Sequence, residues 1–453
     1  MTPDERSGTA TAPRAPPRAE AFRYWLRLGC ISFGGPAGQI ALMHRELVDE
    51  KRWISERRFL HALNFCMVLP GPEATQLATY IGWLLHRTWG GVVAGTLFVL
   101  PSLVLLAALS WLYLVYGSVP AVAGIFHGIK PAVVAIVLHA AWRIGTRALK
   151  HPLLWLLAAL AFVAIFALDA PFPAIVACAA LAGAIGGRVV PRAFAHGGHG
   201  PDRAAAHAPA VIDDDTPTPP HARYSLAGLV RVLAACGTLW AAVLGTLALA
   251  FGAAGTLVTM GWFFTKAAFL TFGGAYAVLP YVYQGAVETY GWLGPTQMID
   301  GLALGETTPG PLIMVVAFVG FLGGYAQPLL ASPALSGALA ATVVTFFTFL
   351  PSFLFILAFG PLIETTHGQV RYTAPLTAIT AAVVGVVVNL AVFFAWHVFW
   401  PSGWQPSPLA ATDVFAVVVA GAAALALFRF KAHVIPVIAA CGAAGLLHAL
   451  FVG

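Results

Sequence analysis

Long apolar runs separated by short polar segments dominate the chain from about residue 22 onward. Six runs come first, at about 22–43, 59–86, 90–117, 119–142, 152–168 and 171–187. A single run at about 226–252 follows, and six more complete the chain, at about 257–283, 298–325, 334–360, 374–400, 412–428 and 433–451. Most runs are near the ~20 residues that a helix needs to cross a bilayer, so the pattern predicts an all-α polytopic membrane protein.

Composition supports membrane helices and not membrane strands. Of the 453 residues, 59% are hydrophobic and 9% are charged, whereas a soluble protein carries about 25% charged residues. The strands of a transmembrane barrel would alternate in polarity over ~10 residues, and these long runs do not. The polar stretches are interpreted as a disordered cytoplasmic tail at 1–21 and a soluble cytoplasmic linker at 188–224.

Two of the first runs contain residues that break helices. Phe33-Gly34-Gly35 lies in one and Pro70-Gly71-Pro72 in the other, and glycine adds backbone freedom while proline removes an N–H donor. An unpaired backbone group costs several kcal/mol in hydrocarbon, so a break survives only inside protein or beside a wet cavity. The free N–H groups and positive dipole end of a broken helix suit an anion. A kinked and tightly packed helix is the alternative interpretation.

The same breaks recur in the second half of the chain. Phe272-Gly273-Gly274 and Pro309-Gly310-Pro311 repeat the two motifs at a constant offset of 239 residues. Leu350-Pro351-Ser352 then repeats Leu100-Pro101-Ser102 at an offset of 250 residues. Constant offsets predict two homologous repeats, at 22–187 and 257–451, joined by a connecting transmembrane helix at 226–252. Interrupted segments at matching positions of two halves indicate the binding site of a secondary transporter.

Charge predicts that the second repeat is inverted. The loop at 44–58 carries five Lys and Arg residues and the matching loop at 283–297 carries none, which places them on opposite sides of the membrane. We therefore interpret the excess of Lys and Arg in the first half as setting the orientation in the membrane, and not as a surface that binds nucleic acid. We expect a cytoplasmic N-terminus and a periplasmic C-terminus. The four broken segments are expected at the interface between the repeats. If they are re-entrant, the basic loop at 44–58 stays cytoplasmic and the chain has nine full spans. If every segment crosses the membrane, the chain has thirteen spans.

The broken segments resemble the signature of the chromate ion transporter family. The segment Phe-Gly-Gly-Pro-Ala-Gly-Gln-Ile at 33–40 and the segment Leu-Pro-Gly-Pro-Glu-Ala-Thr-Gln-Leu-Ala at 69–78 carry this resemblance. The weaker copies at 272–274 and 308–311 match the long, two-domain form of the family. The resemblance covers about 22–187 and 257–451, and leaves out the tail and the linker.

This resemblance implies a secondary active transporter that exports chromate and confers chromate resistance. It implies a multi-pass protein of the cell inner membrane, energised by the proton gradient or the membrane potential. The implied partners are chromate, sulfate as a related anion, protons, the lipid bilayer and a second copy of the chain in a homodimer.

A site for a tetrahedral oxyanion needs converging N–H and hydroxyl donors away from bulk water. Glycines at the breaks let backbone N–H groups approach the anion, and polar side chains nearby add donors. An intramembrane lysine usually faces a cavity or a partner. The candidate substrate-binding residues are Gly34, Gly35, Gln39, Gly71, Thr75, Gln76, Lys130, Gly273, Gly274, Thr308 and Gly310. Hydroxyls that bond back to their own helix and a lysine that reaches the membrane surface are the alternatives.

Two carboxylates are candidates for coupling. Glu73 and Glu306 flank the two Pro-Gly-Pro breaks on opposite sides. A carboxylate in apolar surroundings is readily protonated, so it can carry a proton. A fixed structural partner for a lysine or a backbone N–H is the alternative.

The sequence gives less support to other classes of function, such as an enzyme or a channel. The chain has no Walker A, HExxH or GxSxG pattern, which gives no support for ATP hydrolysis or an integral-membrane enzyme. We therefore expect no enzymatic activity, no cofactor and no metal site. A passive anion channel stays open as an alternative, because the same breaks would also serve a pore.

Overall fold

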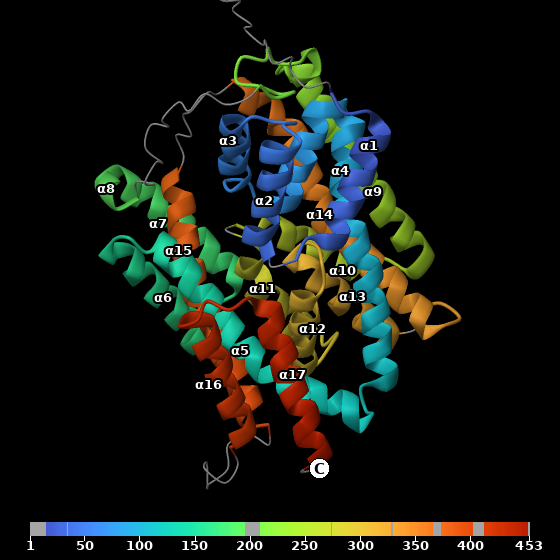
Figure 1. Cartoon of the computed structure of the whole chain (residues 1–453), viewed down its shortest axis with the longest axis vertical. Helices are drawn as coiled ribbons and strands as arrows, with labels where there is room; N and C mark the ends of the chain where they lie inside the picture. Colours follow the sequence, from blue (N-terminus) through green and yellow to red (C-terminus); the bar gives the residue numbers. More distant parts are fainter. Residues whose placement is uncertain are drawn as a thin grey trace, which may run out of the picture.

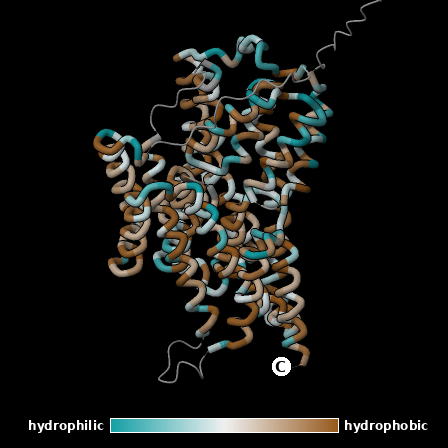
Figure 2. The backbone as a smooth tube through the Cα atoms, turned by 60° about the vertical axis from the view of Figure 1, so that its left-hand side comes forward, coloured by the Kyte–Doolittle hydropathy of each residue, from teal (hydrophilic) through white to brown (hydrophobic). Residues whose placement is uncertain are grey.

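The computed structural model describes residues 15–33, 35–194, 209–272, 274–327, 329–365, 373–401 and 412–451. Within these ranges the chain is helical, and its β structure is limited to an isolated parallel bridge between Ile54 and Ile212. Seven helices are long and apolar enough to cross a membrane. Figure 2 shows hydrophilic residues gathered most densely at the upper end of the molecule. The prediction of an all-α polytopic membrane protein is confirmed.

The two halves contain similar series of helices, except that the kinked α4 of the first half stands where the second half has η4, α13 and α14; one connecting helix lies between the halves. The first half consists of α1 (Arg18–Ile31), α2 (Gly35–His44), η1 (Arg45–Glu50), α3 (Glu56–Cys66), α4 (Glu73–Tyr116), α5 (Pro120–Ala148), α6 (Pro152–Leu168) and α7 (Phe172–Val189). Between the halves lie α8 (Pro191–Phe194), η2 (Pro220–Ala222) and the connecting helix α9 (Leu226–Phe251). The second half consists of α10 (Thr256–Phe269), α11 (Ala275–Tyr283), η3 (Gln284–Thr289), α12 (Pro295–Thr307), η4 (Leu312–Met314), α13 (Val315–Ala326), α14 (Pro333–Thr365), α15 (Thr373–Phe399), α16 (Val414–Phe428) and α17 (Val434–Phe451).

Some features of the backbone occur at equivalent positions of the two halves even where the residues at those positions differ. The π-helices η1 and η3 begin at equivalent positions of the two halves, Arg45 and Gln284. The N–H of Trp53 donates to the carbonyl of Leu47 at 2.8 Å, and the N–H of Trp292 donates to that of Ala286 at 2.7 Å. Such local details follow the same offset as the motifs, which supports the interpretation of the halves as homologous repeats.

The helices beside the breaks are short. In the first half α1, α2 and α3 have 14, 10 and 11 residues, so the longest spans about 21 Å of a hydrocarbon core that is ~30 Å thick. Figure 1 shows these three helices in the upper half of the molecule and α12 in the lower half. These lengths favour the re-entrant alternative over thirteen full spans.

The helix α4 contains a sharp change of direction. In the sequence this position shows only as the gap between the apolar runs at about 59–86 and 90–117. His86 has φ −135° and ψ 29°, and Arg87 has φ 60° and ψ −160°, so the chain changes direction there. The part before this kink completes the second broken segment, and the part after it is a long membrane helix. An arginine at positive φ carries no sequence signal, which is why the kink could not be predicted.

The outer helices of each half pack on the other half. Helices α6 and α7 pack on α15, while α16 and α17 pack on α5. Small residues permit these contacts: a Cβ added at Gly385 on α15 would lie 1.9 Å from the carbonyl oxygen of Ala158 on α6. Close backbone approach is how membrane helices gain packing energy without a hydrophobic driving force. The two halves therefore form one interleaved body.

Gly385→Val should separate α15 from α6. The added methyl groups have no space, and overpacking of this kind costs about 1–3 kcal/mol. We expect a lower midpoint of thermal unfolding in detergent and less folded protein in the membrane. The control is Gly421→Val on α16, where an added Cβ meets no atom within 4 Å. Equal unfolding midpoints for the two variants would contradict this account of the packing.

Candidate functional site

The breaks of the two halves bond to each other. The N–H of Gly71 donates to the carbonyl of Thr271 at 2.7 Å, and the N–H of Gly310 donates to the carbonyl of Ser32 at 2.8 Å. Each bond joins a Pro-Gly-Pro break of one half to the Phe-Gly-Gly break of the other, and the two bonds are equivalent under the repeat. We call the region formed by residues 32, 33, 35, 70–72, 271, 272, 274 and 309–311 the crossing.

Four helices begin at the crossing. α2 and α11 start directly after the Phe-Gly-Gly breaks, and α4 and η4 start directly after the Pro-Gly-Pro breaks, with α13 continuing from η4. The first N–H groups of a helix have no partner within it, and the helix dipole makes this end positive. The arrangement collects N–H donors and positive potential at one place without using charged side chains.

Buried polar side-chain atoms without hydrogen-bond partners lie at or beside the crossing. Among the described residues these atoms are Ser32 Oγ, Gln39 Oε1, Thr75 Oγ1, Gln76 Oε1, Ser102 Oγ and Ser352 Oγ. Buried polar atoms in folded proteins are nearly always paired, because an unpaired one costs about 1–3 kcal/mol. Such a group of unpaired donors and acceptors is suited to a polar ligand or to ordered water.

Ser102 and Ser352 are site residues that the sequence interpretation missed. A Cβ added at Gly310 would lie 2.7 Å from Ser102 Cβ, and one added at Gly71 would lie 2.5 Å from Ser352 Oγ. Each serine therefore touches the Pro-Gly-Pro break of the other half. Both end a Leu-Pro-Ser motif that revealed the repeat, and this recurrence was the available signal.

The predicted glycines lie at the breaks where the structure describes them. Positive φ angles of 69°, 127°, 97° and 100° occur at Gly35, Gly71, Gly274 and Gly310, a conformation that residues with a Cβ rarely adopt. The other two predicted glycines, Gly34 and Gly273, lie outside the described residues.

The predicted polar side chains divide into two groups. Gln39 is buried and donates through Nε2 to the carbonyl of Gly310 at 2.5 Å, and Gln76 donates to the carbonyl of Pro70 at 2.7 Å. Thr75 keeps its hydroxyl unpaired. Thr308 instead donates to the carbonyl of Gly305 at 3.1 Å, which is the back-bonding alternative.

The two candidate coupling carboxylates share a cationic neighbour. Glu73 begins α4, and its Oε1 lies 3.9 Å from the position of a Cβ added at Gly274. Glu306 is buried and accepts a hydrogen bond from the hydroxyl of Tyr276. Arg143 on α5 interacts electrostatically with both carboxylates. The sequence interpretation assigned this arginine only to membrane orientation.

Lys130 lies in another polar group. Its Nζ is 3.5 Å from Asp300 Oδ2, which also accepts a hydrogen bond from the hydroxyl of Tyr113 at 2.8 Å. The structure therefore pairs this predicted substrate ligand with a carboxylate on α12 and does not bring it to the glycines of the crossing.

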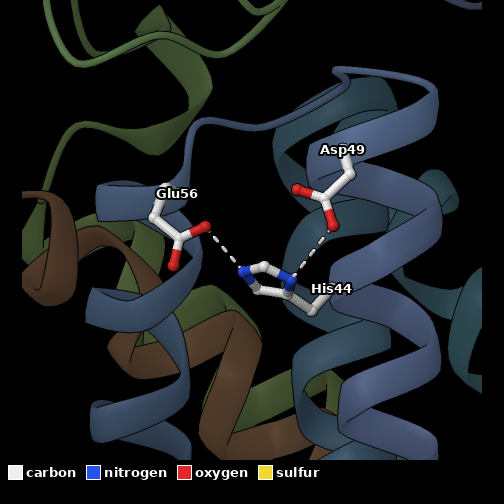
Figure 3. A group of neighbouring side chains, drawn as sticks. All are labelled: His44, Asp49 and Glu56. Carbon is white, nitrogen blue, oxygen red and sulfur yellow. Dashed lines mark hydrogen bonds and ion pairs between the residues drawn. The ribbon is translucent and has the colours of Figure 1, made fainter. Parts of the chain in front are cut away.

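His44, Asp49 and Glu56 form a group with the composition of a metal site (Figure 3). Nε2 of His44 lies 2.6 Å from Glu56 Oε2, and Nδ1 lies 3.6 Å from Asp49 Oδ2. Each ring nitrogen faces its own carboxylate, with Nε2 in a hydrogen bond to Glu56 and Nδ1 in ion-pair range of Asp49, so contacts among the three side chains account for the group without a metal. The expectation that no metal is bound stays a prediction.

Comparison with known proteins identifies the family. The chromate transporter family model matches residues 19–184 and 258–446. A chromate transport protein of Pseudomonas aeruginosa is 34% identical over 98% of this chain and 96% of its own length. A chromate transport protein of Cupriavidus metallidurans is 29% identical over 82% of this chain and 81% of its own. No solved structure matches. The relatives are transport proteins and not enzymes, and this chain belongs to the chromate transporter family.

Proposed function

We propose that the protein exports chromate by secondary active transport, with the crossing as its anion site. The observation that carries this proposal is the meeting of four helix N-termini with unpaired hydroxyls from both halves. Chromate is a tetrahedral dianion, so it accepts hydrogen bonds from several directions at once. Helix N-termini and neutral hydroxyls supply such donors without holding the anion as strongly as a cation would.

Sulfate is the second candidate substrate. It has the same shape and charge as chromate, and the hydroxyls of Ser32, Ser102 and Ser352 offer donors to either anion. The geometry of these donors supports tetrahedral dianions as a class, and the relatives' printed names favour chromate.

Ser102→Ala and Ser352→Ala should each weaken anion binding. Each variant removes one donor, and a hydrogen bond to a charged group is worth about 1.5–3 kcal/mol, so we expect KM for chromate to rise about tenfold or more. Uptake into inverted vesicles measures this. The control is Thr342→Ala, an exposed threonine on α14 that bonds back to Ala338. Wild-type KM in both serine variants would place the anion site elsewhere, and flux that never saturates would indicate a channel.

We further propose an inner-membrane protein with a cytoplasmic N-terminus, an inverted second half and a periplasmic C-terminus. The reciprocal bonds of the crossing, Gly71 to Thr271 and Gly310 to Ser32, relate the halves by a two-fold operation, as an inverted repeat requires. Figure 1 also shows α1 beginning at the upper end and α17 ending at the lower end.

Reporter fusions test this topology. A reporter placed after Gly200 should report the cytoplasm and one placed at Gly453 should report the periplasm, because an odd number of crossings separates the two points. Activity of both fusions on the same side of the membrane would exclude the inverted repeat.

Glu73 is our proposed proton carrier. Its position at the start of α4 stabilises the ionised carboxylate through the helix dipole, while an arriving dianion opposes that charge. Protonation would then depend on whether the anion is bound, which links the two fluxes. Arg147 and Arg143 on α5 also act electrostatically on this carboxylate, so its charge state depends on more than the helix dipole.

Glu73→Gln should remove the coupling and keep the transport path. The amide preserves shape and hydrogen bonding but cannot titrate. We expect chromate exchange to continue while accumulation driven by an imposed pH gradient is lost. Glu306→Gln is the matched control and should have a smaller effect, because Tyr276 can still donate to its remaining oxygen. Accumulation by Glu73→Gln vesicles at the wild-type rate would show that another group carries the proton.

A further inference from the structure

Two polar clusters of the same composition join the halves. In each cluster the basic residue and the tyrosine come from the first half, and the acidic residue comes from the second half. The linker-side cluster consists of Arg58, Tyr80 and Glu364, and the opposite cluster consists of Tyr113, Lys130 and Asp300. Neither cluster as a whole was recognisable from the sequence, because their members lie up to 306 residues apart.

The linker-side cluster ties α3 to the end of α14. Arg58 Nη1 donates to Glu364 Oε2 at 2.7 Å, and the hydroxyl of Tyr80 donates to Glu364 Oε1. The Glu364 side chain is 2% exposed. Both of its oxygens are paired, so this charge is buried only because its partners are in place.

The opposite cluster ties α12 to the end of α4 and to α5. Tyr113 and Lys130 both contact Oδ2 of Asp300, at 2.8 Å and 3.5 Å, and the Asp300 side chain is 3% exposed. Oδ1 of Asp300 has no partner among the described residues. This cluster is therefore the less completely paired of the two.

The clusters lie on opposite sides of the crossing. α3 and α12 are equivalent helices that begin at matching positions of the two repeats, and each ends within four residues of a Pro-Gly-Pro break. Arg58 lies eight residues before the end of α3 and Asp300 seven before the end of α12, which corresponds to about 10–12 Å along each helix. Figure 1 shows α14 ending at the top of the molecule and α4 ending at the bottom.

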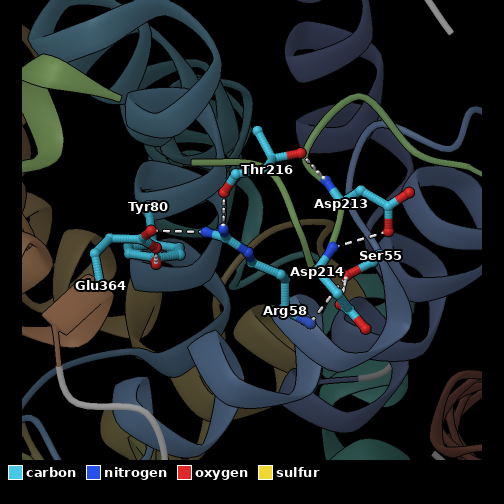
Figure 4. A network of polar contacts seen from close by, with 7 residues as sticks. All are labelled: Ser55, Arg58, Tyr80, Asp213, Asp214, Thr216 and Glu364. Carbon is cyan, nitrogen blue, oxygen red and sulfur yellow. Dashed lines mark hydrogen bonds and ion pairs between the residues drawn. The ribbon is translucent and has the colours of Figure 1, made fainter. Parts of the chain in front are cut away.

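Part of the linker closes over the linker-side cluster (Figure 4). Arg58 Nη2 donates to the carbonyl of Thr216 at 2.6 Å, and Ser55 Oγ donates to Asp214 Oδ1 at 2.6 Å. The N–H of Ser55 also donates to the carbonyl of Ile212 at 2.9 Å. The segment therefore holds the beginning of α3 in the position that allows its arginine to reach Glu364.

We propose that the two clusters are the two gates of the transporter, which open in alternation. The inference rests on the proposed transport function. A buried acid in a cluster has two stable arrangements, paired and dry or separated and hydrated, because a partly separated pair leaves a buried charge without compensation. A secondary transporter with a central site needs one such barrier on each side of that site.

Cys66 provides a reporter for the linker-side gate. Its thiol is fully buried at the end of α3, between Arg58 and the Pro-Gly-Pro break. A variant in which Cys30, Cys178, Cys236 and Cys441 are replaced by serine leaves it as the single thiol. A membrane-impermeant maleimide applied to inverted vesicles or to intact cells then measures access from each side, and this measurement does not require chromate.

In that background Arg58→Gln should label at Cys66 at least tenfold faster from the linker side and transport chromate poorly. Tyr80→Phe removes a single hydrogen bond and should give a smaller increase, so the test does not depend on one variant. The exchanged pair Arg58→Glu with Glu364→Arg should return both labelling and transport toward the starting values. The control is Arg57→Gln, at the neighbouring exposed position, which should change neither the labelling rate at Cys66 nor chromate transport.

The opposite gate gives the complementary result. Asp300→Asn should reduce transport without faster labelling from the linker side, and the exchange Lys130→Asp with Asp300→Lys should restore transport. Wild-type labelling rates in both Arg58→Gln and Tyr80→Phe would overturn the gates. If the parent protein with Cys66 as its single thiol does not carry chromate, but Arg58→Gln still labels faster than that parent, the gates are supported and the proposed substrate is refuted, so the two failures are distinguishable.

Discussion

The need to pair every backbone polar group inside a membrane governs this structure. Four breaks free N–H and carbonyl groups at the level where neither water nor a continuing helix is available. The molecule resolves this by bonding the break of one half to the break of the other, through Gly71 to Thr271 and Gly310 to Ser32. Side chains of the same half pair some break groups, as Gln76 does for the carbonyl of Pro70, but these two backbone bonds are made between the halves. The crossing is therefore both the junction that holds the halves together and the place where helix N-termini meet.

The sequence predicted those features of the fold that are encoded locally. Apolar runs gave the helices, and glycine and proline gave the breaks, because these residues impose their conformation on the backbone wherever they occur. The constant offset between the paired motifs predicted the repeat, and the matching π-helices and Trp53 and Trp292 bonds support it. The kink at His86 and Arg87 had no such marker, since neither residue favours the conformation that it adopts.

The candidate site was predictable only in part for a related reason. Residues inside the motifs, such as Gly71 and Gln39, were found because the motifs themselves mark the breaks. Ser102 and Arg143 reach the same region from other helices, and their contributions depend on how α4 and α5 pack. Lys130 was predicted as a substrate ligand because it is an intramembrane charge, and only the structure identifies Asp300 as its ion-pair partner.

The exchange of outer helices between the halves has a consequence for biosynthesis. Helices α6 and α7 are complete by residue 189, whereas the helix on which they pack, α15, begins at residue 373. At about 5–20 residues per second, a ribosome needs on the order of 10–40 s to make the intervening chain. Throughout that interval the first half is inserted in the bilayer with its small-residue faces against lipid. The first half therefore cannot complete the packing of α6 and α7 until the second half has been made.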